Sequence, residues 1–197
     1  MPQRCVLAMA VGVVVLAAAL PARAELDEKQ VMITGGAPKG RAYNFFGFTG
    51  DDTITRTTVS YTGHHKPGTI VINTAERRLY LVQEGGTALR YGIGVGRVGF
   101  TWKGVRTITD KKEWPAWTPP EQMLKRQPYL PRYMPGGIDN PLGARALYLG
   151  GTLYRIHGSN EPETIGQAVS SGCFRMTNED VKDLYERVKI GTTVVVQ

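Results

Sequence analysis

The stretch "AVSSGCFRMTNED", residues 168 to 180, places one cysteine, Cys173, between a turn of small residues and the start of a helix. Thr177, with Asp180 three positions later, forms an N-terminal capping pair. Four apolar residues then follow at the i, i+3, i+4, i+7 spacing of one helix face: Val181, Leu184, Tyr185 and Val188. We predict a helix that starts at Thr177 and that Gly191 ends, with "TTVVVQ" after it as a last buried strand.

Short β-type runs precede this stretch and predict a β-rich domain. They are "TIVIN", "RLYLVQE", "LRYGIGVG", "ARALYLGG" and "TLYRIHG". Polar or glycine turns separate them, and the first three are typical of an antiparallel meander. With the helix, these runs predict a mainly β, α+β fold: one β-sandwich or mixed-sheet domain over residues 67–197. Residues 25–66 are interpreted as an extended arm, although "TITRTTVSYTG" within it has the character of a strand.

A proline-rich stretch, "EWPAWTPPEQMLKRQPYLPRYMPGG", runs from residue 113 to residue 137. Its six prolines exclude regular strands and leave room for one or two helical turns over residues 121–126. A long irregular segment in a compact domain is usually a binding loop or a lid. Trp114, Trp117 and Tyr133 are candidate walls of a site under such a lid.

The first 24 residues have the pattern of a secretory signal peptide. Arg4 precedes an apolar run over residues 6–20, and Ala22-Arg23-Ala24 is an A-x-A cleavage site. A run of about 15 residues is shorter than the roughly 20 that a spanning helix needs, so we expect no transmembrane segment in the mature protein. Cleavage would also remove Cys5, the only other cysteine. An unpaired cysteine in an oxidising compartment indicates an intermolecular disulfide or a reactive thiol.

Composition limits the partners that we expect. The chain has 24 Lys and Arg against 17 Asp and Glu, a net charge of +7. This basic balance suits an anionic polymer such as cell wall or an outer-leaflet lipid surface. No basic run with interleaved aromatics suggests nucleic acid. The literal G-x-G-x-x-G at residues 94–99, "GVGRVG", is followed by strand-and-turn sequence where a dinucleotide site needs a helix. We therefore expect no cofactor.

Cys173 needs a base or a cation nearby, because a free thiol is only slightly ionised at neutral pH. The chain has three histidines. His64 and His65 lie in a polar turn and are interpreted as solvated, whereas His157 ends the strand-like "LYRIH" sixteen residues before the cysteine. One cysteine and one histidine fall short of the three or four ligands that zinc takes, so no metal site is predicted.

The residues around Cys173 suit acyl chemistry. Ser170, Ser171 and Gly172 are small enough for a substrate carbonyl to approach the backbone, whose amides could form an oxyanion hole. Arg175 could fix the turn or hold a substrate carboxylate. A serine hydroxyl is a weaker candidate nucleophile than the neighbouring thiol, which ionises more readily.

A third group that would orient the imidazole of His157 is not evident from spacing. Asn160, Glu161 and Asn178 are near in sequence, and a backbone carbonyl such as that of Gly158 could also fix the tautomer.

The segments "YRIHGSNEP" and "IGQAVSSGCFRM" closely resemble the signature of the YkuD-type L,D-transpeptidases, and the resemblance covers about residues 67 to 197. It implies Cys173 as nucleophile, His157 as general base and the carbonyl of Gly158 as the group that orients it. Ser170, Gly172 and Arg175 occupy supporting positions of the motif. Many members have a second histidine where Ser171 stands here, which leaves His157 as the candidate base.

The resemblance also implies a periplasmic enzyme that acts on peptidoglycan stem peptides. Cysteine attack on the diaminopimelate carbonyl of a tetrapeptide would release D-Ala, and an amine would resolve the thioester. The product would be a 3→3 cross-link or an attached envelope protein, and members are typically acylated by carbapenems. Three alternatives stay open: resolution by water, as in an L,D-carboxypeptidase or amidase; a non-catalytic wall-binding module; and a sortase-like or papain-like thiol enzyme.

Overall fold

The computed structural model describes residues 54–197, so the predicted signal peptide and most of the predicted arm lie outside the described residues. Nine strands form one mixed sheet in the order β1-β4-β3-β2-β11-β6-β7-β8-β10, and β5 pairs with β9 in a small second sheet. The strands are β1 (Thr57–Ser60), β2 (Ile70–Asn73), β3 (Arg78–Gln83), β4 (Thr87–Gly92), β5 (Val95–Gly96), β6 (Gly104–Glu113), β7 (Arg145–Leu149), β8 (Arg155–His157), β9 (Ala168–Ser170), β10 (Phe174–Arg175) and β11 (Thr193–Val196). Three helical segments complete the described chain: α2 (Glu121–Arg126), a 3-10 turn (Pro162–Thr164) and α3 (Asn178–Arg187).

The predicted meander is present as β2, β3 and β4, which pair antiparallel in sequence order. The sheet extends one strand further than predicted, because β1 pairs antiparallel with the edge of β4. Side chains of β1 alternate between half-buried and exposed, as expected of an edge strand with one covered face. Thus residues 57–60, which the sequence placed in the arm, belong to the sheet.

The predicted last strand, β11, lies in the middle of the sheet. It pairs parallel with β2 on one side and antiparallel with β6 on the other. The residues of β6 were interpreted only as strand-and-turn material, yet β6 is ten residues long and continues the sheet into β7. β7 pairs antiparallel with β8, and β8 pairs parallel with the short β10 that follows the cysteine.

Helix α3 starts as predicted, with the Thr177 side chain accepting a hydrogen bond from the Asp180 backbone N–H at 3.1 Å. The prediction that Gly191 ends it is wrong, because the helix stops at Arg187 and Val188 is already extended. Lys111 from β6 explains the earlier end: its Nζ donates to the carbonyls of Tyr185 and Val188, both at 2.6 Å. A cation at these unpaired carbonyls satisfies the C-terminal end of the helix.

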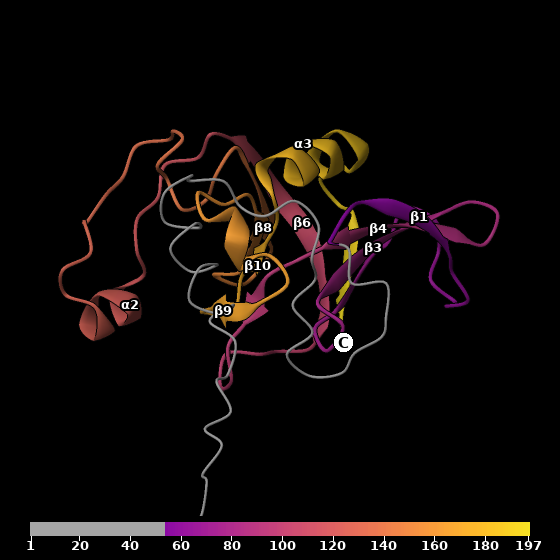
Figure 1. Ribbon diagram of the computed structural model, residues 1–197, viewed down its shortest axis with the longest axis horizontal. Helices are drawn as coiled ribbons and strands as arrows, with labels where there is room; N and C mark the ends of the chain where they lie inside the picture. The colour runs from indigo at the N-terminus through magenta and orange to yellow at the C-terminus, as the bar shows by residue number, and fades with distance from the viewer. Residues whose placement is uncertain (1–53) are drawn as a thin grey trace, which may run out of the picture. The chain divides into compact units, whose positions relative to one another are not determined.

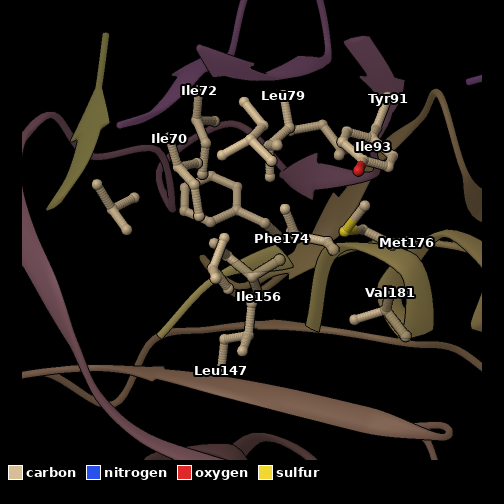
Figure 2. Close-up of a cluster of buried hydrophobic side chains, with 14 of the residues drawn as sticks. Ile70, Ile72, Leu79, Tyr91, Ile93, Leu147, Ile156, Phe174, Met176 and Val181 are labelled. Carbon is tan, nitrogen blue, oxygen red and sulfur yellow. The ribbon is translucent and has the colours of Figure 1, made fainter. Parts of the chain in front are cut away.

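The hydrophobic core joins the sheet to α3, as Figure 2 shows for the side chains around Phe174. Phe174 and Met176 are 1% and 0% exposed and flank the half-buried Arg175, so the segment after the cysteine is anchored by alternate side chains. Figure 1 shows α3 covering β8 at one end of the sheet, and α2 at the outer end of the long excursion between β6 and β7. The core therefore fixes the cysteine segment, while the proline-rich segment reaches outward.

Candidate active site

His157 is the last residue of β8 and is 5% exposed. Its Nδ1 lies 2.6 Å from the carbonyl oxygen of Gly158. A carbonyl oxygen can only accept, so Nδ1 carries the proton and Nε2 keeps its lone pair. The other three groups near in sequence have different partners. Asn178 accepts from the Ala144 backbone N–H at 2.8 Å, Asn160 donates to a backbone carbonyl, and Glu161 pairs with an arginine.

The turn before Cys173 is held by one buried hydroxyl. Ser170 is 4% exposed, donates to the Cys173 carbonyl at 2.6 Å and accepts from the Gly172 backbone N–H at 3.1 Å. Because the Ser170 hydroxyl both donates and accepts a hydrogen bond within the turn, it serves to hold the turn together. This supports the Cys173 thiol as the better candidate nucleophile. The Gly172 amide is thereby committed to Ser170, so the predicted oxyanion hole cannot use it without breaking this tie.

Glycine is required at position 172. Its φ of +108° is rarely adopted by residues with a side chain, and a Cβ there would lie 2.4 Å from a ring carbon of Tyr154. Trp102 stacks on Tyr154 with ring centroids 4.8 Å apart and donates from Nε1 to the Gly172 carbonyl at 3.0 Å. The backbone of the turn therefore packs directly on two aromatic rings.

The parallel pairing of β8 with β10 places Arg175 level with His157. Arg175 forms an ion pair with Glu161 at 2.8 Å and contacts the Thr164 hydroxyl at 3.3 Å. Its backbone also exchanges hydrogen bonds with Gly94 in both directions, at 2.8 and 2.9 Å. Of the two roles considered for Arg175, the geometry favours fixing the turn.

Cys173 and His157 open into the same cavity of about 750 Å³. Ser170, Ser171 and Arg175 line it as well, and so does Trp117 from the proline-rich segment. Other lining residues come from α2 and the proline before it, from the β7–β8 connection and the start of β8, and from the turn before β6: Pro120, Gln122, Met123, Arg126, Thr152, Leu153, Tyr154, Arg155 and Phe100 among them. The proline-rich segment thus forms part of the cavity wall, as a lid would.

Two of the three aromatic residues proposed as walls do not line this cavity. Trp114 has a left-handed backbone conformation, with φ of +41°, and its ring lies 5.8 Å from the Lys182 Nζ of α3. Tyr133 is 61% exposed. The turn at the end of β6 directs the Trp114 side chain toward α3, so this tryptophan does not form a wall of the cavity.

Burial disfavours the charged forms of both candidate catalytic groups. The pKa of the Cys173 thiol is raised because the sulfur is desolvated, an effect that hydrogen bonding and charge from Arg155, and the charge of Arg175, oppose. The pKa of His157 is lowered to about 3, chiefly by burial, with Arg175 and Arg155 adding to the shift and the Gly158 carbonyl opposing it. Burial therefore favours the neutral imidazole and the protonated thiol in this cavity.

Sequence reasoning missed Arg155 and the loop before it. Arg155 and His157 are two residues apart on β8, so they face the same side of the strand, and both line the cavity. This period of two was available in "LYRIH" and could have identified Arg155. The loop residues that precede it gave no comparable signal, since they lie in an irregular connection.

The glycine-rich motif has no helix after it. Its residues form β5 and a turn, and the next regular element is β6, so the motif lacks the helix N-terminus that a dinucleotide site needs. Within residues 54–197, no group of three His, Cys, Asp or Glu side chains could hold a metal ion. Over the same residues, no helix is long and apolar enough to span a membrane.

The tautomer-fixed histidine ends β8, and the thiol directly precedes the neighbouring parallel strand β10. Enzymes of cysteine acyl transfer use this pair of groups. The family model of the L,D-transpeptidase catalytic domain, YkuD, matches residues 67–196, and the chain belongs to this family. "Probable L,D-transpeptidase YbiS" of Escherichia coli is 44% identical over 135 residues, which are 64% of this chain and 43% of that protein. The chain thus matches about two fifths of the length of that relative.

Two solved structures extend the comparison. The catalytic domain from the Enterococcus faecium L,D-transpeptidase is 23% identical with a TM-score of 0.53, over 68% of this chain and all of that one, and shows the same fold. A structure from Brucella melitensis is 50% identical with a TM-score of 0.50, covering 75% of this chain and 96% of that one. That protein is named a probable carnitine operon oxidoreductase caia, a name that describes a different class from the family model.

Proposed function

We propose that the protein is a cysteine L,D-transpeptidase that acts on peptidoglycan stem peptides, with Cys173 as nucleophile and His157 as general base. The observation that carries this proposal is that Cys173 and His157 line one cavity, with the Nδ1 of His157 fixed on the Gly158 carbonyl so that its Nε2 is free to act as a base. The family of the chain and the names of its curated relatives support the same reaction.

In the proposed reaction, the Cys173 sulfur attacks the carbonyl of the third stem residue, a diaminopimelate, and the thiol proton passes to Nε2 of His157. The tetrahedral intermediate expels the amine of D-Ala, which takes the proton from His157, and a thioester remains. An incoming amine then attacks the thioester, gives its proton to His157 and releases the Cys173 thiol. The backbone N–H of Cys173 is the candidate oxyanion donor, because that of Gly172 is committed to Ser170.

The proline-rich segment is proposed as the lid over the donor site. Its base is fixed by Asn140, which is 1% exposed and whose amide donates to the carbonyls of Met134 and Pro135 at 3.3 and 2.8 Å. Its outer helix α2 contributes Met123 and Arg126 to the cavity wall. Equal catalysis by a variant without residues 115–133 would overturn this assignment.

The acceptor and the location of the protein complete the proposal. We propose residues 1–24 as a cleaved signal peptide, export to the periplasm, residues 25–66 as a segment before the catalytic domain and residues 67–197 as that domain. The acceptor amine belongs to a second stem peptide or to an envelope protein. Analysis of muropeptides after incubation of the protein with isolated sacculi distinguishes cross-linking from trimming, since only hydrolysis leaves free tripeptides.

The test of the nucleophile is intact-protein mass spectrometry after exposure to a carbapenem, with Cys173→Ala as the paired variant. We expect one covalent adduct on the native protein and none on the alanine variant. An unmodified native protein, or an adduct that persists in the variant, contradicts the assignment. A folded Cys173→Ala protein that still binds sacculi would separate wall binding from catalysis.

A further inference from the structure

Neither the burial of Cys173 nor the histidine of the site favours the reactive form of the nucleophile. Only a thiolate attacks efficiently, yet burial works against ionisation of Cys173, and the buried imidazole carries no charge at neutral pH that could stabilise a thiolate. In many thiol enzymes an imidazolium supplies that charge. Here the histidine is neutral in the resting state, so the compensating cation must come from elsewhere.

The charged side chains that line the cavity are all cationic. Of the described residues that line the cavity, Arg155, Arg175 and Arg126 carry charge, and none is an aspartate or glutamate. Arg175 is already paired with Glu161, which neutralises much of its field. Arg126, on α2, lies over the ring of Phe100 at 5.1 Å. Arg155 is the remaining cation, and no carboxylate within residues 54–197 forms an ion pair with it.

Arg155 is held in place by two contacts, and it shares one of these partners with the Cys173 sulfur. Its Nη1 donates to the Leu153 carbonyl oxygen at 3.2 Å, and the Cys173 Sγ lies 3.9 Å from that same oxygen. Its guanidinium lies over the ring of Tyr148 at 5.0 Å, and Tyr148 is its cross-strand partner on β7. Lys112 approaches the same ring at 5.3 Å. The cation and the sulfur therefore converge on one carbonyl, and the sheet fixes the cation there.

Arg155 also has one N–H group that makes no hydrogen bond in the described structure. Its Nε is buried and has no hydrogen-bond partner among the described residues. A buried donor without a partner is costly unless it is used in another state of the site. A sulfur that becomes an anion at the shared carbonyl would offer such a partner.

We propose that Arg155 is a positioning residue that stabilises the Cys173 thiolate, so that the reactive ion pair of this site is thiolate and guanidinium rather than thiolate and imidazolium. His157 then serves in proton transfer and contributes little to the resting ionisation of the thiol. The inference rests on the proposed function for the identity of the nucleophile, and it gives a role to Arg155, to which the family resemblance assigns none.

The experiment measures the rate of Cys173 alkylation by iodoacetamide in the full chain between pH 6 and pH 10. Mass spectrometry of the Cys173 peptide separates it from Cys5. For Arg155→Met we expect the apparent pKa to rise by about one unit and the rate at pH 7 to fall about tenfold, with an unchanged plateau at high pH. Arg155→Lys keeps the charge and should shift less. Lys189→Met, an exposed cation removed far from the cavity, should leave the profile unchanged.

His157→Gln decides between the two ion pairs. The proposal expects its alkylation pKa to rise less than that of Arg155→Met, whereas a thiolate–imidazolium pair requires the larger rise in the histidine variant. An unchanged profile in folded Arg155→Met, or a lower plateau with an unchanged pKa, overturns the proposal. If the methionine variant does not fold, Arg155→Gln, which keeps a donor for Leu153, takes its place and must show the same shift.

The outcomes also separate this inference from the proposed function. Alkylation needs no substrate, so a shifted profile without a carbapenem adduct would refute the acyl-transfer proposal and leave the role of Arg155 standing. A carbapenem adduct on Cys173, with an unchanged alkylation pKa in Arg155→Met, would support the acyl-transfer proposal and refute the role of Arg155.

Discussion

The two sides of the candidate active site are built differently. On one side, the turn over residues 170–175 is tied by a buried hydroxyl, packed on aromatic rings and anchored by Phe174 in the core. On the other, the proline-rich segment carries a short helix with no buried residue. Reacting groups need fixed positions, whereas a substrate must enter and leave. If the proposed function holds, we expect the turn to set the rate of chemistry and the proposed lid to set the affinity for substrate.

Removal of the base should have the largest effect on the rigid side. His157→Gln keeps a polar side chain near Gly158 but offers no basic nitrogen, so we expect the rate of acylation to fall about 10²- to 10⁴-fold. The measurement is the rate of adduct formation followed by mass spectrometry. His65→Gln is the control, since His65 lies outside the cavity and bonds the Tyr61 hydroxyl. A loss of less than threefold would remove His157 from the reaction.

The buried histidine should also make stability depend on pH. Its pKa is about 3 in the folded protein and 6.5 when exposed, so the unfolded chain binds one more proton between these values. The free energy of unfolding should therefore fall as pH falls below 6.5, by ~1.4 kcal/mol per pH unit from this residue, and be unaffected above it. Urea unfolding at several pH values measures the slope. In His157→Gln that part of the slope should vanish; an identical slope would contradict the lowered pKa.

Gly172→Ala tests how little movement the turn tolerates. The new Cβ would clash with the ring of Tyr154, and the alanine would have to adopt a φ that is unfavourable for a residue with a side chain. We therefore expect a loss of ~2–5 kcal/mol in stability. The displaced sulfur should react about 100-fold more slowly. Gly68→Ala is the matched control, because Gly68 has a φ of +82° but nothing within 4 Å of its Cβ. Equal effects in the two variants would show that backbone strain alone, and not the aromatic packing, limits the turn.

Ser170→Ala should have a smaller effect. It removes two hydrogen bonds inside the turn and leaves the Cys173 carbonyl and the Gly172 amide without that partner, at a cost of ~1–3 kcal/mol. We expect a slower acylation by about tenfold, measured as before, and a lower midpoint of thermal unfolding. Ser60→Ala on the edge strand β1 serves as the control. Full activity in Ser170→Ala would show that the packing of Phe174 is sufficient to hold the turn.

Changes in the lid should have the smallest effect on chemistry. Arg126→Met removes the guanidinium that lies over Phe100, so we expect a few-fold rise in KM for a stem peptide, with kcat and stability nearly unchanged. Lys125→Met is the control, because Lys125 is exposed, does not line the cavity and pairs with Glu121 on the same helix. A fall in kcat without a rise in KM would show that α2 acts on the chemistry and not on substrate binding.

How far the sequence predicts this molecule depends on the range of the interactions. The cap of α3, the meander and the helical turns at residues 121–126 follow from local patterns, and the structure has them all. The end of α3 was missed because Lys111, more than seventy residues earlier, supplies the partner for its carbonyls. The direction of Trp114 was missed because one left-handed residue at a strand end leaves no pattern in the sequence.

The candidate site shows the same division. His157, Cys173 and the carbonyl of Gly158 are close in sequence or carried by a recognisable motif, whereas the cavity around them is assembled from α2, the β7–β8 connection and the turn at Phe100. Arg155 could be predicted in part from the sequence and in part only from the fold. Its alternation with His157 was readable, but its convergence with Cys173 on the Leu153 carbonyl depends on the fold.

The central position of β11 has a consequence for how the two halves of the sheet depend on each other. In the described part of the chain, β11 pairs parallel with β2 on one side and antiparallel with β6 on the other. Four residues, 193–196, therefore carry the backbone pairing between the meander and the half of the sheet in which the thiol stands. We expect the two halves to unfold as one cooperative unit, since each loses its neighbour when β11 leaves the sheet.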